Sequence, residues 1–136
     1  MSRGLPLTAL AMLVCCLTVC ASGGRASPGE SFVPGESFAL SVRQQIMLPD
    51  AATLRYIGIA NDSRCPPKVQ CIRAGDADVL FDFTSSGASP VRITLNTERV
   101  RTANIGIWRL QLLELAQGNR PRATLRIDAY ETGATP

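Results

Sequence analysis

Apolar and polar side chains alternate along much of the chain after residue 37, which is the period expected of half-buried β-strands. Runs with this alternation or a β-rich composition cover residues 38–43, 53–60, 91–96, 108–113 and 125–130. The cleanest run is residues 76–83, where one face carries Ala77, Val79, Phe81 and Phe83 and the other carries Asp76, Asp78, Leu80 and Asp82. The pattern predicts about seven short antiparallel strands.

Residues 109–117 carry enough leucine and alanine to be interpreted as a helix, but their alternation and the β-rich entry at Ile105, Ile107 and Trp108 favour a strand. Turn-forming residues separate the runs at positions 49–50, 61–75, 85–90 and 118–121. A lone sheet would leave one apolar face of its strands in water. We therefore predict an all-β domain, either an antiparallel β-sandwich or a partly open barrel.

The first residues have the pattern of an export signal, with Arg3 before an apolar run at residues 5–19 and small residues after it. Cleavage after Ala21 would make residues 1–21 a signal peptide. Cleavage before Cys20, in the lipobox-like run at residues 17–20, would make that cysteine a lipid anchor. Residues 22–36, rich in Gly, Ser and Pro, predict a flexible linker, and residues 37–133 the β domain. We expect a periplasmic or extracellular protein, or an outer-membrane-anchored lipoprotein.

Only Cys65 and Cys71 lie outside this leader. An even number of cysteines in an exported chain indicates a disulfide bond. Zinc binding is the alternative, but two cysteines without any histidine make a poor tetrahedral site. We therefore predict a Cys65–Cys71 disulfide and no metal site.

The net charge of +3 is too small to indicate a nucleic-acid or anionic-membrane surface by itself. The absence of histidine excludes sites that depend on imidazole, so we predict no catalytic site and no cofactor. A small hydrolase with an unrecognised carboxylate site is the weakest alternative. Seven arginines are expected on solvent-facing strand surfaces, with a basic face toward an acidic partner as the alternative: Arg92, Arg99, Arg101, Arg109, Arg120, Arg122 and Arg126.

Two interpretations of the cysteine loop stay open. The disulfide either clips a strand connection, with Arg64 paired to Asp62 or Asp76, or it preorganises residues 66–70 as a recognition loop with Lys68 at its tip. In the second case we expect an envelope protein as partner, no nucleic acid, and membrane contact only through Cys20. A protease inhibitor that uses the same loop is the alternative function. The candidate binding residues are Asp62, Arg64, Pro66, Pro67, Lys68, Gln70 and Arg73.

The loop resembles a motif of small exported bacterial β domains, often lipoproteins, of uncharacterised function. Their pattern is D-S-R-C-P, a few residues, C, then a hydrophobic residue, often Trp, and A/E-G. Arg73 stands where that aromatic residue is expected. The resemblance implies a β fold and export, but no activity. The matching residues are Asp62, Ser63, Arg64, Cys65, Pro66, Cys71, Ala74 and Gly75.

Overall fold

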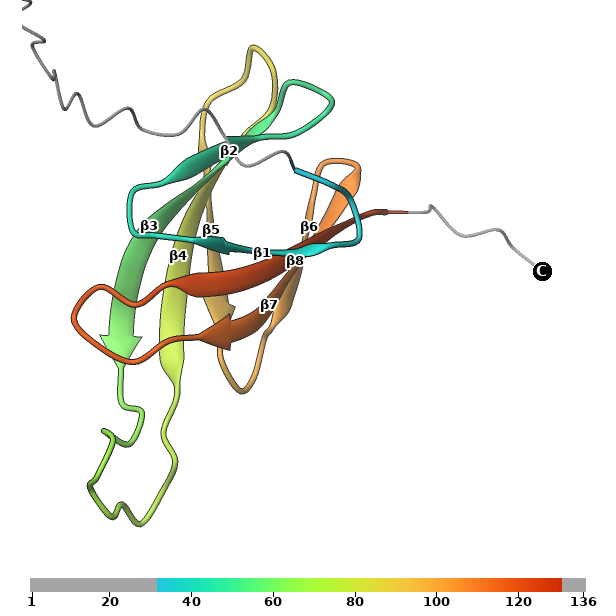
Figure 1. The fold of residues 1–136 in the computed structure, drawn as a ribbon. Coiled ribbons are helices and arrows are strands. Elements are labelled where there is room, and N and C mark those ends of the chain that lie inside the picture. The colour runs from blue at the N-terminus through green and yellow to red at the C-terminus, as the bar shows by residue number, and fades with distance from the viewer. Residues whose placement is uncertain (1–31, 131–136) are drawn as a thin grey trace, which may run out of the picture.

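The computed structural model describes residues 32–130, so the predicted leader with Cys20, most of the predicted linker and residues 131–133 lie outside the described residues. All the regular structure in the described residues is β (Figure 1). This confirms the predicted all-β class. The strands are β1 (Ser37–Leu40), β2 (Gln45–Met47), β3 (Thr53–Asp62), β4 (Ala77–Thr84), β5 (Val91–Asn96), β6 (Thr102–Ile105), β7 (Trp108–Leu115) and β8 (Ala123–Ala129).

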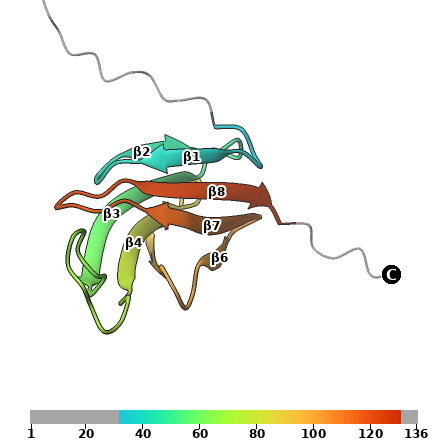
Figure 2. The same ribbon diagram turned by 60° about the horizontal axis from the view of Figure 1, so that its bottom comes forward.

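The strands form two antiparallel sheets, with orders β1-β8-β7-β6 and β2-β3-β4-β5. The two sheets face each other (Figure 2), which makes the fold a β-sandwich rather than a barrel. Most neighbours in a sheet are also neighbours in sequence. The exception is β1, which pairs with the last strand, so that Phe38 lies opposite Leu125.

The core lies between the sheets and follows the predicted alternation. In β4 the side chains of Ala77, Val79, Phe81 and Phe83 are buried, while the intervening ones are half-buried. The buried Tyr56 ring packs against Phe81, and its hydroxyl donates to the carbonyl of Pro121 at 3.0 Å. Burial raises the pKa of Tyr56 to about 12.

Two strands, β2 and β6, are absent from the predicted runs because they are three and four residues long. So short a strand shows too little alternation to be distinguished from a loop. β1 is equally short, but there the alternation in the sequence continues to Val42, beyond the end of the strand. The ambiguous segment after Ile107 is a strand, β7, as predicted. Trp108 at its start is buried, as expected, and its Nε1 has no hydrogen-bond acceptor within the described part of the chain.

The last residues of the predicted linker pack onto the sandwich. Phe32 meets the rings of Phe38 and Trp108 edge to face, with centroids 5.7 and 6.1 Å away. Gly35 donates its N–H to the carbonyl of Ile127 at 2.8 Å. Packing against the sandwich therefore extends back to Phe32.

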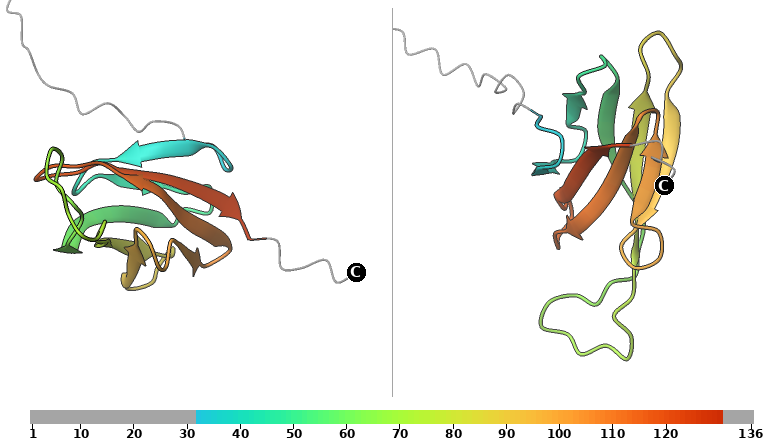
Figure 3. Two further views of the ribbon diagram at one scale, coloured as in Figure 1. Left: turned by 90° about the horizontal axis from the view of Figure 1, so that it is seen from below. Right: turned by 90° about the vertical axis from the view of Figure 1, so that its right-hand side faces the viewer.

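One connection departs from the compact outline of the sandwich. The chain between β3 and β4 projects from the end opposite the β2–β3 and β4–β5 loops (Figures 1 and 3). β3 has ten residues, with irregular register between Tyr56 and Gly58 and again between Ile59 and Asn61. No helix in residues 32–130 is long and apolar enough to cross a membrane.

Candidate functional site

The projecting connection, residues 62–76, is called the cysteine hairpin, and its outer part, residues 66–74, the tip. Backbone pairing continues past the ends of β3 and β4: Ser63 N–H donates to the carbonyl of Asp76, and Cys65 N–H to that of Ala74, both at 2.8 Å. The Ser63 hydroxyl also lies 3.1 Å from the Asp76 carbonyl. The base of the hairpin, residues 62–65 and 75–76, is thus a continuation of the sheet.

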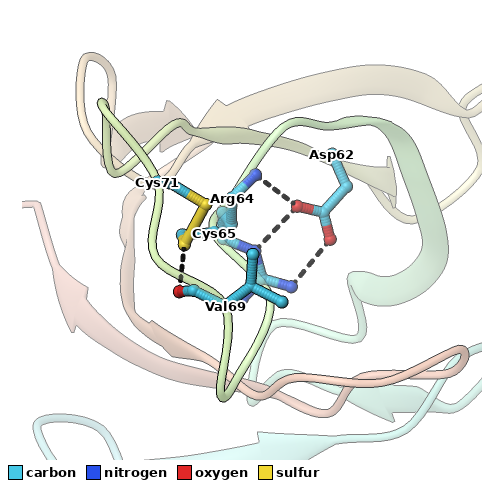
Figure 4. The surroundings of a disulfide bond; sticks show 5 residues. All are labelled: Asp62, Arg64, Cys65, Val69 and Cys71. Carbon is cyan, nitrogen blue, oxygen red and sulfur yellow. Dashed lines mark hydrogen bonds and ion pairs between the residues drawn. A yellow bond between two sulfur atoms is a disulfide. The ribbon is translucent and has the colours of Figure 1, made fainter.

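The predicted disulfide is present between Cys65 and Cys71, with the two Cα atoms 5.8 Å apart (Figure 4). It closes the tip directly above the last backbone pair. Within the closed ring, Val69 N–H donates to the carbonyl of Pro66 at 3.3 Å. Pro66 and Pro67 add two fixed φ angles, so the ring has little freedom left.

Arg64 fastens the hairpin to the sandwich. Its Nε and Nη2 donate to the two carboxylate oxygens of Asp62 at 2.9 and 2.8 Å, as Figure 4 shows, and its Nη1 donates to the carbonyl of Leu115 in β7 at 2.7 Å. The side chain is only 10% exposed. The hydrogen bonds from Arg64 lower the pKa of Asp62. Asp62 therefore holds the Arg64 side chain in position, and Arg64 stabilises the ionised Asp62 carboxylate.

The predicted aspartate face of β4 is paired with neighbouring polar groups. Asn96 donates its amide to Asp76 at 2.9 Å and to Asp78 at 2.7 Å, and Arg99 forms an ion pair with Asp76. The Asn96 hydrogen bond is the first cause of the lowered pKa of Asp76. Asp82 pairs with Arg92. Within residues 32–130 no three His, Cys, Asp or Glu residues are grouped so as to hold a metal ion.

Gly75 closes the hairpin at a position that only glycine fits. Its φ is +70°, and a Cβ atom there would lie 1.8 Å from the carbonyl oxygen of Ser63. The motif glycine is thus required where the chain returns to β4.

The tip presents side chains to solvent on all its residues. Ile72 has a relative exposure of 105% and Val69 of 55%, although both are apolar. Lys68 and Arg73 are exposed and form no ion pair within the part of the chain that the structure describes. Gln70 lies among them, also exposed. The sequence prediction did not name Val69, which lies within the predicted loop of residues 66–70, or Ile72, which lies just beyond it.

The predicted binding residues therefore divide into two sets. Asp62 and Arg64 lie at the base and are satisfied by each other. Pro66, Pro67, Lys68, Gln70 and Arg73 lie at the tip. A hollow of about 350 Å³ lies between the base and the β7–β8 turn; it is lined by Asp62, Arg64, Pro66, Pro67, Gln117, Gly118 and Asn119.

Comparison with known proteins finds no matching family model, no matching curated protein and no matching solved structure. The fold places the chain among disulfide-stapled antiparallel β-sandwiches.

Proposed function

We propose that the chain is an exported, non-catalytic domain of the bacterial cell envelope that binds another envelope component through the tip of the cysteine hairpin. The observation that carries the proposal is that the tip exposes Val69 and Ile72 while its base is firmly held. Export is supported by the leader pattern and by the motif around Cys65. The envelope protein expected from the sequence is one such component.

A rigid tip supports binding because little conformational entropy is lost when it is immobilised. The disulfide, the Arg64 anchor and the two prolines restrict the tip before any partner arrives. Burial of exposed apolar side chains against a partner favours binding, by about 25 cal/mol per Å² of apolar surface removed from water. If the disulfide only fastened the strand connection to the sheet, the contacts at the base would be needed, but apolar side chains at the tip would not.

The alternative function, a protease inhibitor that presents Lys68, is less well supported. The φ angle of Lys68 is +66°, in the left-handed region. A segment that enters a protease cleft in the manner of a substrate lies extended, with negative φ. Lys68 is therefore a corner of the loop and not part of an extended segment.

The proposal can be tested by sedimenting the purified protein with fragments of the bacterial envelope. The double variant Val69→Ser/Ile72→Ser removes the apolar tip. Its matched control, Met47→Ser/Ile107→Ser, removes two side chains that are 68% and 60% exposed elsewhere on the surface. We expect the tip variant to lose about tenfold or more in association, which is the effect of about 1.4 kcal/mol, and the control to lose none.

Both variants should keep the melting temperature of the unchanged protein, because all four side chains are exposed. Association that is the same for the tip variant and the unchanged protein would overturn the proposed function.

A further inference from the structure

The tip combines apolar side chains with positive charge and contains no negative charge. Residues 63–75 include Arg64, Lys68 and Arg73 but no aspartate or glutamate. Arg64 is neutralised by Asp62 at the base. Two cations that form no ion pair in the described part of the chain therefore flank the exposed Val69 and Ile72 at the end of the hairpin.

Resting on the proposed function, we propose that the component bound by the tip is an anionic lipid surface. Val69 and Ile72 enter the boundary between headgroups and acyl chains, and Lys68 and Arg73 contact the lipid phosphates. This combination is usual at a membrane surface: apolar side chains are buried shallowly, and cations remain at headgroup level. The long stems of Lys and Arg allow the charges to reach back to the phosphates.

The surroundings of the tip favour a lipid surface over a protein. A stable protein interface takes about 20–30 residues from each partner, whereas the tip has nine and projects alone from the sandwich (Figure 3). The nearest turn, at Gln117, Gly118 and Asn119, is polar and would extend the surface without any apolar anchor. A membrane needs no matching shape, so a small convex tip is sufficient.

The two prolines reduce the number of backbone donors in the tip. Unpaired N–H groups are costly in an apolar medium. Pro66 and Pro67 carry no N–H, and the N–H groups of Cys65 and Val69 are paired inside the hairpin. The two prolines thus remove two donors that would otherwise oppose insertion.

The whole-chain charge of +3 does not reveal this surface, because the two cations act locally. Attraction to anionic lipid falls off within a Debye length, so only charges at the tip contribute fully once it touches the membrane. We expect weak, reversible binding, since a single shallow apolar contact does not anchor a protein stably.

The experiment uses vesicles made of equal parts phosphatidylglycerol and phosphatidylcholine, with pure phosphatidylcholine vesicles as reference. We expect the unchanged protein to bind the anionic vesicles more tightly and to be released by salt. Ile72→Ser should weaken binding about tenfold, from the apolar area lost. Lys68→Gln and Arg73→Gln should each weaken it about fivefold. The matched controls Ile107→Ser and Arg55→Gln, both exposed on the sandwich away from the tip, should bind as the unchanged protein does.

A second readout follows the tip directly. In an Ile72→Trp variant the new indole starts in water, whereas Trp108 is already buried. Its fluorescence should shift to shorter wavelength on anionic vesicles and not on phosphatidylcholine alone.

Failure of the unchanged protein to bind these vesicles would overturn the lipid proposal, and so would equal losses in the tip and control variants. If envelope fragments still capture the protein through Val69 and Ile72, the proposed function stands and the component is a protein. If that tip-dependent capture is also lost, the proposed function fails as well. Melting temperature and an intact disulfide by mass spectrometry show that each variant is folded.

Discussion

Arg64 uses both sides of its guanidinium group, donating to Asp62 at the end of β3 and to the carbonyl of Leu115 in the opposite sheet. A residue of this kind fixes the position of the hairpin relative to both sheets. From the sequence, Asp62 and Asp76 were both possible partners of Arg64, and in the structure the partner is Asp62. The sequence could not predict Leu115, which is 51 positions away and contributes only a backbone oxygen.

The first prediction concerns this anchor. Arg64→Lys should lower the free energy of unfolding by about 1–2 kcal/mol, because an ammonium group cannot donate to both partners in the same geometry. Arg92→Lys is the matched control: that arginine also pairs with an aspartate but is 52% exposed, so its loss of stability should be clearly smaller. Urea unfolding of both variants measures the difference, and equal losses would show that Arg64 is an ordinary surface ion pair.

The second prediction separates steric clash from backbone conformation at Gly75. Gly75 and Gly87 have φ angles of +70° and +73°, but a Cβ atom meets the Ser63 backbone at the first and open space at the second. Gly87→Ala should therefore cost about 1–2 kcal/mol from its left-handed φ alone. Gly75→Ala should cost clearly more, by about 2 kcal/mol or greater. Equal thermal unfolding of the two variants would contradict the close approach of the Ser63 carbonyl to Gly75.

The third prediction follows from the lowered pKa of Asp62, caused by its hydrogen bonds from Arg64. A carboxyl whose pKa is lower in the folded state stabilises the fold above its ordinary value of 3.8. That contribution is lost as the pH falls through the lower, folded value. The free energy of unfolding should thus decrease in acid, and less steeply in Asp62→Asn, when measured by urea unfolding at a series of pH values. An identical decrease in both proteins would mean that Asp62 is not the group responsible.

At the level of elements, strands β3 and β4 and the turn between them were the easiest part of the fold to predict. The alternation of β4 shows which side chains are buried, and Pro, Gly and Cys mark where the chain must turn. What the sequence could not show is that the loop extends outward with Ile72 fully exposed. Alternation assigns a side chain to a sheet face, but residues beyond the sheet have no face to be assigned to.

The fourth prediction tests the role of the disulfide in this element. Replacing both Cys65 and Cys71 by serine should lower the free energy of unfolding by about 2 kcal/mol, the loss expected for so small a ring. Amide hydrogen exchange should speed up in residues 66–74, while β3 and β4 keep their protection, because Arg64 and Ser63 still close the base. Faster exchange throughout both strands would show instead that the disulfide holds the sheet together.

For the whole molecule, the all-β fold class and much of the hydrophobic core could be predicted from the sequence. The pairing of β1 with β8 could not. Alternation says that a strand has a buried face, but not which distant strand lies beside it. The packing of Phe32 was not predicted either, because Pro34 and Gly35 look like linker residues. Phe32, which lies before them, nevertheless packs onto Trp108.

The fifth prediction concerns that contact. Phe32→Ala should lower the free energy of unfolding by about 2 kcal/mol, somewhat less than for a fully buried phenylalanine. Val33→Ala is the neighbouring control, and because its side chain is half exposed the expected loss is below about 1 kcal/mol. If chemical unfolding gives the same loss for both, Phe32 does not belong to the folded domain in solution.

The Phe32 contact also has a mechanical consequence. Because β1 and β8 are antiparallel, with Ser37 opposite Arg126, both ends of the described chain leave from the same end of this strand pair. A force pulling the two ends apart would open the pair one hydrogen bond at a time, which is the direction of least resistance. The force would reach the ring of Phe32, seated on Phe38 and Trp108, before it reached β1. For a domain tethered through its N-terminus, that ring is the first point of resistance to tension.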